Sequence, residues 1–398
     1  MAIDVCIRFV LSSGGSDAAD GLTWDTAKAT AQAAYGALPA TGGVVMFGPG
    51  RHNVGAGLLL DRTKPVRLQG VGRWRGFASA ILPYTGSDPC LYSYGPSVVD
   101  LSTPLAFTDG QGFEFYDLVF EIAATTLYGI YAPCVTRARV RNCMFLSLNP
   151  TGWGVYTLND ATRGDDASWW RVTDNVAVGC GLFKAAGGGP PPSQNNSQHN
   201  DIIVADNEGQ ASGATVPFVW LTFAHRSVVK DNSLEGYSSL TYGSLYYYGC
   251  FGCQSRGNGG EASGTNYFTV LAGCGGCLVE DIGTSSPTAS DRLVWFTGNS
   301  RDNTAILHTC TDQYALYQGA QRVFDDDPQK RNYLIAGQSS VFDVLWLANL
   351  KRGSGSPEGI VSGMLGDVYL RSDGGAGTSF YVKEGGAAWA TRSGWKAK

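Results

Sequence analysis

Short apolar stretches alternate with short polar turns along most of the chain. In each turn, one residue separates a strand-like stretch from the next. Aligned on this feature, the turns place these residues at one position: Asp117, Asn142, Asn175, Asn207, Asn232, Asn258, Ile282 and Asn299. Their separations are 25, 33, 32, 25, 26, 24 and 17 residues. A period in the mid-twenties without an intervening helix predicts a right-handed parallel β-helix, a single-stranded solenoid whose coils stack about 4.8 Å apart.

The composition agrees with an all-β chain. The 398 residues include 54 glycines, 16% charged residues and 12% aromatic residues, which suits short strands and tight turns better than helices. A formal net charge of -5 gives no basic surface for nucleic acid, and no apolar run is long enough for membrane insertion. Residues 1–17 lack the basic and apolar regions of a secretory signal, so we expect cytoplasmic synthesis without a signal peptide and free thiols for the ten cysteines.

Two C-x-x-C motifs, Cys250 with Cys253 and Cys274 with Cys277, have the spacing of a four-thiolate zinc site. They also lie 24 residues apart, which is the period of the coils. Each cysteine of the first motif should therefore lie beside its counterpart in the next coil. We expect an interior stack of small residues with no bound metal and no cofactor. Zinc is the alternative, because stacked strands can bring four thiolates together.

The asparagines Asn175, Asn207 and Asn232 are expected to form a structural ladder. Asparagine tolerates the left-handed conformation of such turns, and its amide can hydrogen-bond to the same residue in the next coil. An aspartate lies before several of these positions: Asp174, Asp206, Asp231 and Asp281. Like charges one coil apart repel, so we expect these carboxylates to face water, with a shared calcium ion as the alternative.

The N-terminal part carries one resemblance. Residues 26–38 are alanine-rich with apolar residues at helical spacing, and they predict a short helix that covers the open end of the solenoid. Residues 9–54, which include "GGSDAADGLTWDTAKAT" and "GGVVMFGPG", resemble the opening of right-handed β-helix proteins of the pectate-lyase-like superfamily. "VRLQGVGRW" at 66–74 is similar to the coil that follows in that superfamily. The resemblance implies the fold, which hosts lyases, hydrolases and non-enzymatic binders.

The C-terminal part carries a second resemblance. "VYLRS" and "SFYVKE" flank a glycine-rich turn and predict a β-hairpin. Residues 359–398 as a whole resemble the tail found on β-helical phage tail and spike proteins, for which the family expectation is a homotrimer. A single hairpin is too small to be stable alone, so association with neighbouring chains or with the last coil is expected.

Together these features divide the chain into four parts and imply a function. The parts are an N-terminal strand and capping helix (1–43), a β-helix shaft (44–350), a linker (351–358) and a C-terminal hairpin and oligomerisation module (359–398). The resemblances imply a phage tail spike or minor tail protein of the virion. Its partners would be host cell-surface polysaccharide and other phage tail proteins. The alternatives are a polysaccharide depolymerase, either a lyase or a glycoside hydrolase, and a purely structural tail element.

Candidate catalytic residues follow from the depolymerase alternative. Hydrolysis of a glycan requires two carboxyl groups at a suitable separation. Asp165 and Asp166 lie in a coil lengthened by an insertion, and Glu208 directly follows a turn asparagine. Loops that project from a rigid scaffold commonly carry function, but adjacent acids are also common on solvated loops. The sequence leaves open whether the protein is an enzyme.

Candidate carbohydrate-binding residues are aromatic, because sugar rings stack on the faces of tryptophan and tyrosine. Trp169 and Trp170 lie beside the two aspartates, and "SLTYGSLYYYG" supplies Tyr242, Tyr246 and Tyr248. Trp170 also falls at a position that other coils fill with interior residues. Alternate residues of a strand point to opposite faces, so only part of the tyrosine cluster can face solvent.

Overall fold

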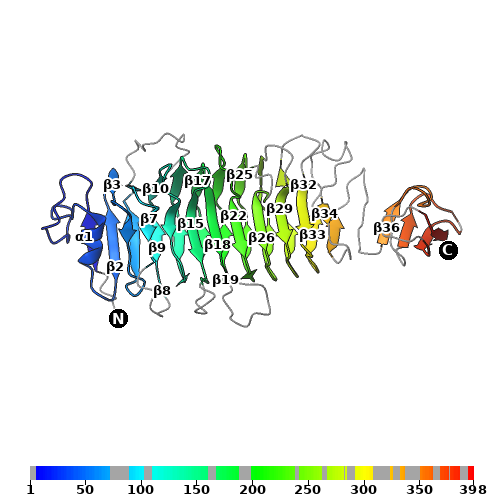
Figure 1. Cartoon of the computed structure of the whole chain (residues 1–398), viewed down its shortest axis with the longest axis horizontal. Coiled ribbons are helices and arrows are strands. Elements are labelled where there is room, and N and C mark those ends of the chain that lie inside the picture. Colours follow the sequence, from blue (N-terminus) through cyan, green and yellow to red (C-terminus); the bar gives the residue numbers. More distant parts are fainter. Residues whose placement is uncertain are drawn as a thin grey trace.

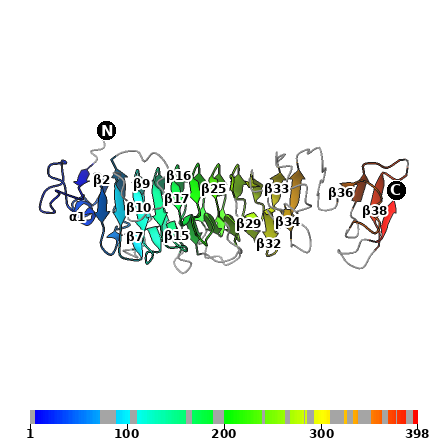
Figure 2. The ribbon, with the colours of Figure 1, turned by 90° about the horizontal axis from the view of Figure 1, so that it is seen from above.

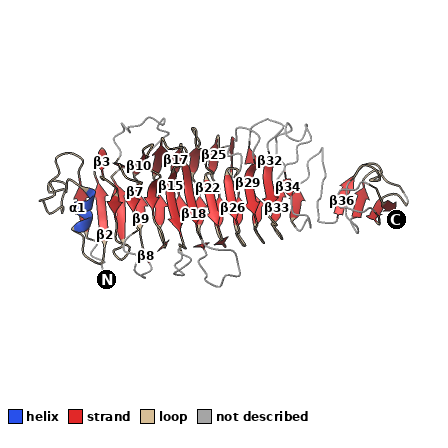
Figure 3. Ribbon diagram, in the orientation of Figure 1, coloured by secondary structure: helices blue, strands red, loops and turns tan. Residues whose placement is uncertain are grey.

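In the computed structural model, most strands stack in parallel into three long sheets that run along the molecule (Figure 1; Figure 3). The structure describes residues 6–71, 89–102, 110–159, 167–187, 199–237, 242–261, 267–281, 283–284, 292–307, 323–325, 332–336, 350–361, 368–375, 377–385 and 393–398. Successive strands along the chain enter the three sheets in turn. One coil therefore supplies one short strand to each sheet, which confirms the predicted parallel β-helix.

The bounds of the strands are as follows. The 12-stranded sheet contains, in spatial order, β1 (Ile7–Val10), β2 (Gly43–Phe47), β5 (Val66–Gly70), β9 (Glu114–Tyr116), β13 (Arg139–Arg141), β16 (Arg171–Thr173), β20 (Ile203–Ala205), β24 (Val228–Lys230), β27 (Gln254–Arg256), β30 (Leu278–Glu280), β33 (Thr304–Leu307) and β35 (Tyr333–Ala336). The 9-stranded sheet contains β3 (Arg51–Asn53), β6 (Cys90–Tyr92), β10 (Val119–Ile122), β14 (Met144–Ser147), β17 (Val176–Val178), β21 (Glu208–Gln210), β25 (Ser233–Glu235), β28 (Gly259–Glu261) and β31 (Gly283–Thr284).

The third long sheet and two short pairs complete the solenoid. The 10-stranded sheet contains β4 (Leu58–Leu59), β7 (Ser97–Asp100), β11 (Tyr128–Tyr131), β15 (Trp153–Leu158), β18 (Gly181–Ala186), β22 (Val219–Thr222), β26 (Leu245–Tyr248), β29 (Tyr267–Ala272), β32 (Arg292–Thr297) and β34 (Val323–Asp325). The short pairs are β8 (Gly110–Gln111) with β12 (Val135–Thr136), and β19 (His199–Asn200) with β23 (Ala224–His225).

Helix α1 (Ala31–Gly36) covers the N-terminal end of the solenoid (Figure 3). Its buried Ala34 and Tyr35 belong to the same hydrophobic cluster as the interior of the coils. The helix is shorter than the predicted 26–38, because Asp17 accepts hydrogen bonds from the backbone N–H groups of Ala29 and Thr30 and holds them outside it. Thr30 is then the N-cap and accepts from the backbone of Ala33. No described helix has the length and apolar character needed to cross a membrane.

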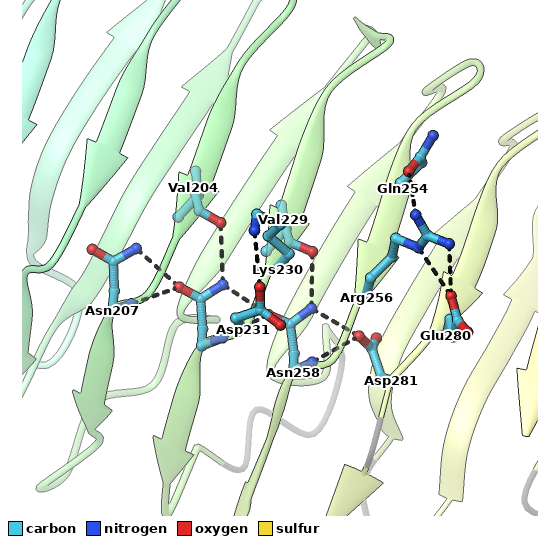
Figure 4. Close-up of polar contacts among 11 residues, drawn as sticks. Val204, Asn207, Val229, Lys230, Asp231, Gln254, Arg256, Asn258, Glu280 and Asp281 are labelled. Atoms are coloured by element: carbon cyan, nitrogen blue, oxygen red, sulfur yellow. Dashed lines mark hydrogen bonds and ion pairs between the residues drawn. The ribbon is translucent and has the colours of Figure 1, made fainter. Parts of the chain in front are cut away.

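Buried asparagines form the expected ladder between the 12-stranded and 9-stranded sheets (Figure 4). The side-chain amide of Asn175 donates to Asn207 at 3.0 Å, that of Asn207 to Asn232 at 2.9 Å and that of Asn232 to Asn258 at 2.7 Å. Each amide also donates to a backbone carbonyl of the preceding coil, as Asn207 does to Val172 at 3.0 Å. The ladder thus satisfies polar groups at every turn it passes.

The strand register corrects the sequence alignment by one residue at the turns of Asp117 and Asn142, and it places Asn299 at a different corner, level with Gly273. Met144 lies opposite Val176, so Cys143 and not Asn142 occupies the position of Asn175. Asn142 instead matches Asp174, and both have left-handed backbones with φ of 52° and 58°. The left-handed residue of these turns is therefore the residue before the ladder asparagine: Asp174, Asp206 and Asp231, and Gly257 before Asn258. The asparagine itself is buried.

The expected solvated aspartates are confirmed at three of four positions. Asp174, Asp206 and Asp231 are exposed, and Asp174 forms an ion pair with Arg141 at 2.9 Å. The prediction is wrong for Asp281, which is 2% exposed. Its carboxylate ends the asparagine ladder by accepting hydrogen bonds from the backbone and side chain of Asn258 (Figure 4). It also accepts hydrogen bonds from the hydroxyls of Ser255 and Thr269.

The four cysteines of the two C-x-x-C motifs lie inside the solenoid, as predicted. Cys250 and Cys274 are 0% and 1% exposed, and the backbone N–H of Cys250 donates to the Sγ atom of Cys274 at 3.4 Å. Cys253 and Cys277 occupy the equivalent positions three residues later and are 1% and 3% exposed. The nine cysteines within the described ranges are free thiols. Among the described residues, no group of three or more His, Cys, Asp or Glu side chains is arranged to hold a metal ion.

The C-terminal part forms a separate four-stranded sheet with its own small core (Figure 2). Its strands are β36 (Leu350–Gly353), β37 (Val368–Arg371), β38 (Phe380–Lys383) and β39 (Trp395–Ala397). β37 and β38 pair in antiparallel fashion, as the predicted hairpin requires, and the core consists of Tyr369, Tyr381 and Trp395. The first residues of the expected linker belong to β36, which pairs with β37.

Candidate functional site

Of the three candidate catalytic residues, the structure describes only Glu208, which lies on a different sheet from Tyr246. Asp165 and Asp166 lie outside the described residues. Glu208 is exposed on β21 and belongs to the 9-stranded sheet, whereas Tyr246 belongs to the 10-stranded sheet. The described residues therefore bring no second carboxylate candidate together with Glu208.

The two adjacent tryptophans have opposite environments. Trp170 is fully buried, its indole N–H donates to the carbonyl of Val135 at 2.8 Å and its ring lies 5.8 Å from that of Phe183. The expectation that Trp170 binds carbohydrate is therefore wrong, because its side chain belongs to the core. Trp169 is 48% exposed, with the guanidinium of Arg137 5.2 Å from its ring centre.

A row of large side chains crosses the outer surface of the 10-stranded sheet. Parallel pairing places one residue from each of five consecutive strands in register: Tyr131, Tyr156, Lys184, Trp220 and Tyr246. Tyr128 and Trp153, three residues earlier on β11 and β15, lie opposite each other beside this row. Trp153 is only 3% exposed because Lys184 and Trp220 pack against its ring. We call these seven residues, together with Tyr242, the aromatic face.

Ring contacts hold the aromatic face together. The ring of Trp220 lies 4.9 Å from that of Tyr246 and 4.6 Å from that of Tyr242. At the other end, the ring of Tyr156 lies 4.6 Å from that of Tyr128 and 5.8 Å from that of Tyr131. Offset and edge-to-face pairs at such distances stabilise each other and restrict the rotamers of their members. The face is therefore built before any ligand arrives.

Lys184 lies at the centre of the aromatic face. Its ammonium group is 4.3 Å from the ring centre of Trp220 and 5.4 Å from those of Trp153 and Tyr156. Burial lowers the pKa of Lys184, since the rings replace water around the charge. The cation–π contacts offset part of that cost, and the ammonium remains a hydrogen-bond donor among the rings.

Two tyrosines of the aromatic face, Tyr156 and Tyr246, keep their protons. Burial raises the pKa of Tyr156 and of Tyr246 to about 12, so both phenols are neutral at physiological pH. A neutral phenol offers a ring for stacking and a hydroxyl that donates and accepts hydrogen bonds. Apolar ring faces surrounded by such hydroxyls match the mixed surface of a sugar, which has C–H faces and a rim of hydroxyl groups.

The remaining candidate tyrosines follow the alternation of a strand. Tyr246 and Tyr248 point outward from β26, whereas Tyr247 between them is 2% exposed and faces the core. Tyr248 is 46% exposed and packs against Phe223 with ring centres 5.4 Å apart, beside the aromatic face and outside its contacts. Of the predicted carbohydrate-binding residues, the structure thus brings together Tyr242 and Tyr246.

Sequence reasoning missed most of the aromatic face. Trp153, Lys184 and Trp220 are distant from the tyrosine cluster along the chain and carry no local motif. Their alignment appears only when the strands of the 10-stranded sheet are placed in register. An alignment of coils on their third strand, in addition to the turn, is the signal that would have found them.

No protein-family model and no curated protein matches this chain. Solved structures with a similar course of the chain include a DFA-IIIase from Arthrobacter chlorophenolicus A6 in complex with GF2. Its TM-score is 0.44 at 10% identity, and the match covers 84% of this chain and 95% of that one. A GH136 lacto-N-biosidase from Eubacterium ramulus has a TM-score of 0.43 at 13% identity, with 83% and 67% covered. Tailspike protein 3 of bacteriophage CBA120 has a TM-score of 0.28 at 9% identity, with 89% and 60% covered. At these identities the likeness concerns the fold alone.

Proposed function

We propose that this protein is a bacteriophage tail spike or minor tail protein that attaches the virion to its host by binding cell-surface polysaccharide. The aromatic face is the observation that supports binding. Its central row covers four strand spacings of about 4.8 Å, or roughly 19 Å, which suits an extended chain of several sugar rings. Phage origin rests on the resemblance of residues 359–398 to phage tail proteins.

A homotrimer fits this function, and the C-terminal sheet supports association. Apolar side chains remain exposed there: Ile360 at 70%, and Leu370 and Phe380 at 38% each. A small sheet with three buried aromatic side chains gains stability by covering such residues against another chain. Three copies of the shaft would multiply weak sugar contacts by avidity.

The test is to incubate the purified protein with host cell-envelope polysaccharide and to measure both retention on the glycan and the appearance of new reducing ends. We expect retention without new ends. Trp220→Ala and Tyr246→Ala should each reduce retention strongly, because each removes a stacking ring. Tyr94→Ala is the matched control, since Tyr94 is an aromatic residue 71% exposed whose ring packs against Tyr92, which is not part of the aromatic face.

Two results would contradict this function in different ways. New reducing ends would favour the depolymerase alternative and would make Asp165, Asp166 and Glu208 the first residues to replace by amides. Absence of retention would favour a structural tail element.

A further inference from the structure

A second surface feature lies on the 12-stranded sheet and its adjoining corner. It is an open groove of about 700 Å³ lined by Glu114, Arg137, Arg139, Trp169 and Arg171, which we call the arginine groove. Three arginines and one carboxylate line it, although the whole chain has a net charge of -5. The groove is therefore locally cationic on an acidic protein.

Strand register explains how the charges are arranged. Arg67, Glu114, Arg139 and Arg171 occupy one row across four neighbouring strands. Glu114 accepts a hydrogen bond from the Nε atom of Arg67 at 2.7 Å and forms an ion pair with Arg139 at 3.4 Å. One carboxylate thus lies between two guanidinium groups, which shows the spacing at which this row accommodates an oxyanion.

Within the described part of the chain, no carboxylate pairs with Arg171 in the next interval of the row. Arg139 lies directly opposite Arg171, and the residue opposite Arg171 on its other side is Ile203. Both arginines are exposed. Like charges in register one strand apart repel, and a bound anion between them converts that repulsion into attraction. Asp201, a described carboxylate at the same corner of the next coil, forms an ion pair with Arg226 at 3.1 Å.

Trp169 adds a stacking surface to the same groove. Its backbone is left-handed with φ of 58°, a conformation that recurs at the same corner of neighbouring coils in Arg137, Asp201, Arg226 and Gly252. Its indole remains 48% exposed at the groove and is flanked by Arg137.

We propose that the arginine groove binds a carboxylate-bearing sugar and that the polysaccharide recognised by this protein is therefore acidic. The carboxylate lies between Arg139 and Arg171, and the sugar ring rests on Trp169. The guanidinium fork matches a planar carboxylate with two parallel hydrogen bonds. This inference rests on the proposed function and narrows it to one class of ligand.

The test compares polygalacturonate oligomers with the same oligomers after reduction of their carboxyl groups to neutral alcohols. Affinity of the full chain is measured by calorimetry at low and high salt. We expect tighter binding of the acidic oligomer, weakening as salt rises. Arg139→Gln and Arg171→Gln should each lower that affinity about tenfold or more, because each removes a charge-assisted hydrogen-bond donor. Trp169→Gly should also weaken binding, without adding backbone strain at the corner.

Arg256→Gln is the matched control, because Arg256 is exposed on the same sheet and pairs with Glu280 far from the groove. It should bind like the unmodified protein. The inference is overturned by any of three results. The two oligomers bind with equal affinity, the acidic oligomer does not bind, or Arg139→Gln and Arg171→Gln both leave its affinity unchanged. If host polysaccharide is still retained and Trp220→Ala abolishes that retention, the proposed function survives that result. Loss of retention by the unmodified protein instead removes the proposed function.

Discussion

Replacing one asparagine of the interior ladder tests how the coils are held together. Asn207 lies in the middle of the ladder and is 1% exposed. Its side-chain oxygen accepts from the backbone and the side chain of Asn175, at 2.9 and 3.0 Å. Its amide group donates to the carbonyl of Val172 at 3.0 Å and to the side chain of Asn232 at 2.9 Å. Asn207→Ala removes all four hydrogen bonds.

The expected loss of stability follows from these contacts. Each hydrogen bond contributes a net of about 0.5–1.5 kcal/mol, so four bonds correspond to about 2–6 kcal/mol. The partners are buried, and alanine leaves the donors of Asn175 and the carbonyl of Val172 without an alternative in the ladder. We therefore expect Asn207→Ala to be among the more destabilising single substitutions of the shaft.

Glu208→Ala is the matched control, since the neighbouring Glu208 is exposed on β21. It should change the free energy of unfolding by no more than about 0.5 kcal/mol. The assay is equilibrium unfolding in guanidinium chloride followed by tryptophan fluorescence, with comparison of midpoints and slopes. If Asn207→Ala unfolds at the same midpoint as Glu208→Ala, the ladder does not stabilise the coils and the reasoning is refuted.

Three further predictions concern buried groups of the shaft. Burial raises the pKa of Asp281, so the protonated side chain stabilises the fold at low pH and this stability is lost as the pH rises through the raised pKa. Asp281→Asn should abolish this pH-dependent loss, measured as the melting temperature across pH. An unchanged pH dependence would contradict the prediction. Burial also raises the pKa of the Cys250 and Cys274 thiols, so they are protonated and unreactive in the folded protein. A thiol reagent should therefore label them only in denaturant. Rapid labelling of the native protein would contradict this and would place them at the surface. Gly260 has φ of 154°, and an added Cβ would lie 1.7 Å from the carbonyl oxygen of Leu234, so Gly260→Ala should destabilise the shaft by about 3 kcal/mol or more, measured by the same unfolding assay.

The coil architecture could be predicted because it repeats. A parallel β-helix requires each turn to lie over the previous one, so the sequence carries the same polar signal every coil. The signal was misplaced by one residue at Asn142, since Cys143 occupies the ladder position there and lacks an amide. The repeat also could not predict that the side chain of Asp281 points inward, because a buried carboxyl group is favourable there only through the hydrogen bonds that the amide ladder before it supplies.

The site could be predicted only where its residues are close together in sequence. Tyr242 and Tyr246 were found because they form a local cluster. The sequence offered both Trp169 and Trp170 as carbohydrate-binding residues. Only the structure of the corner shows that the side chain of Trp169 points outward and that of Trp170 points inward. The contribution of Lys184 depends on the register of strands from three coils, which no local pattern encodes.

The aromatic face and the arginine groove follow from the same property of the solenoid. Outward-facing residues at the same position of consecutive coils lie one strand spacing apart. A continuous binding surface therefore forms wherever several consecutive coils carry side chains of the same kind at that position. Tyr156, Trp169 and Arg171 follow one another within a single coil and belong in turn to the aromatic face, the corner and the charged row. Under the proposed function, an acidic polysaccharide that contacts both rings and guanidinium groups would need both surfaces in this fixed relation, and a rigid stack of coils provides that relation.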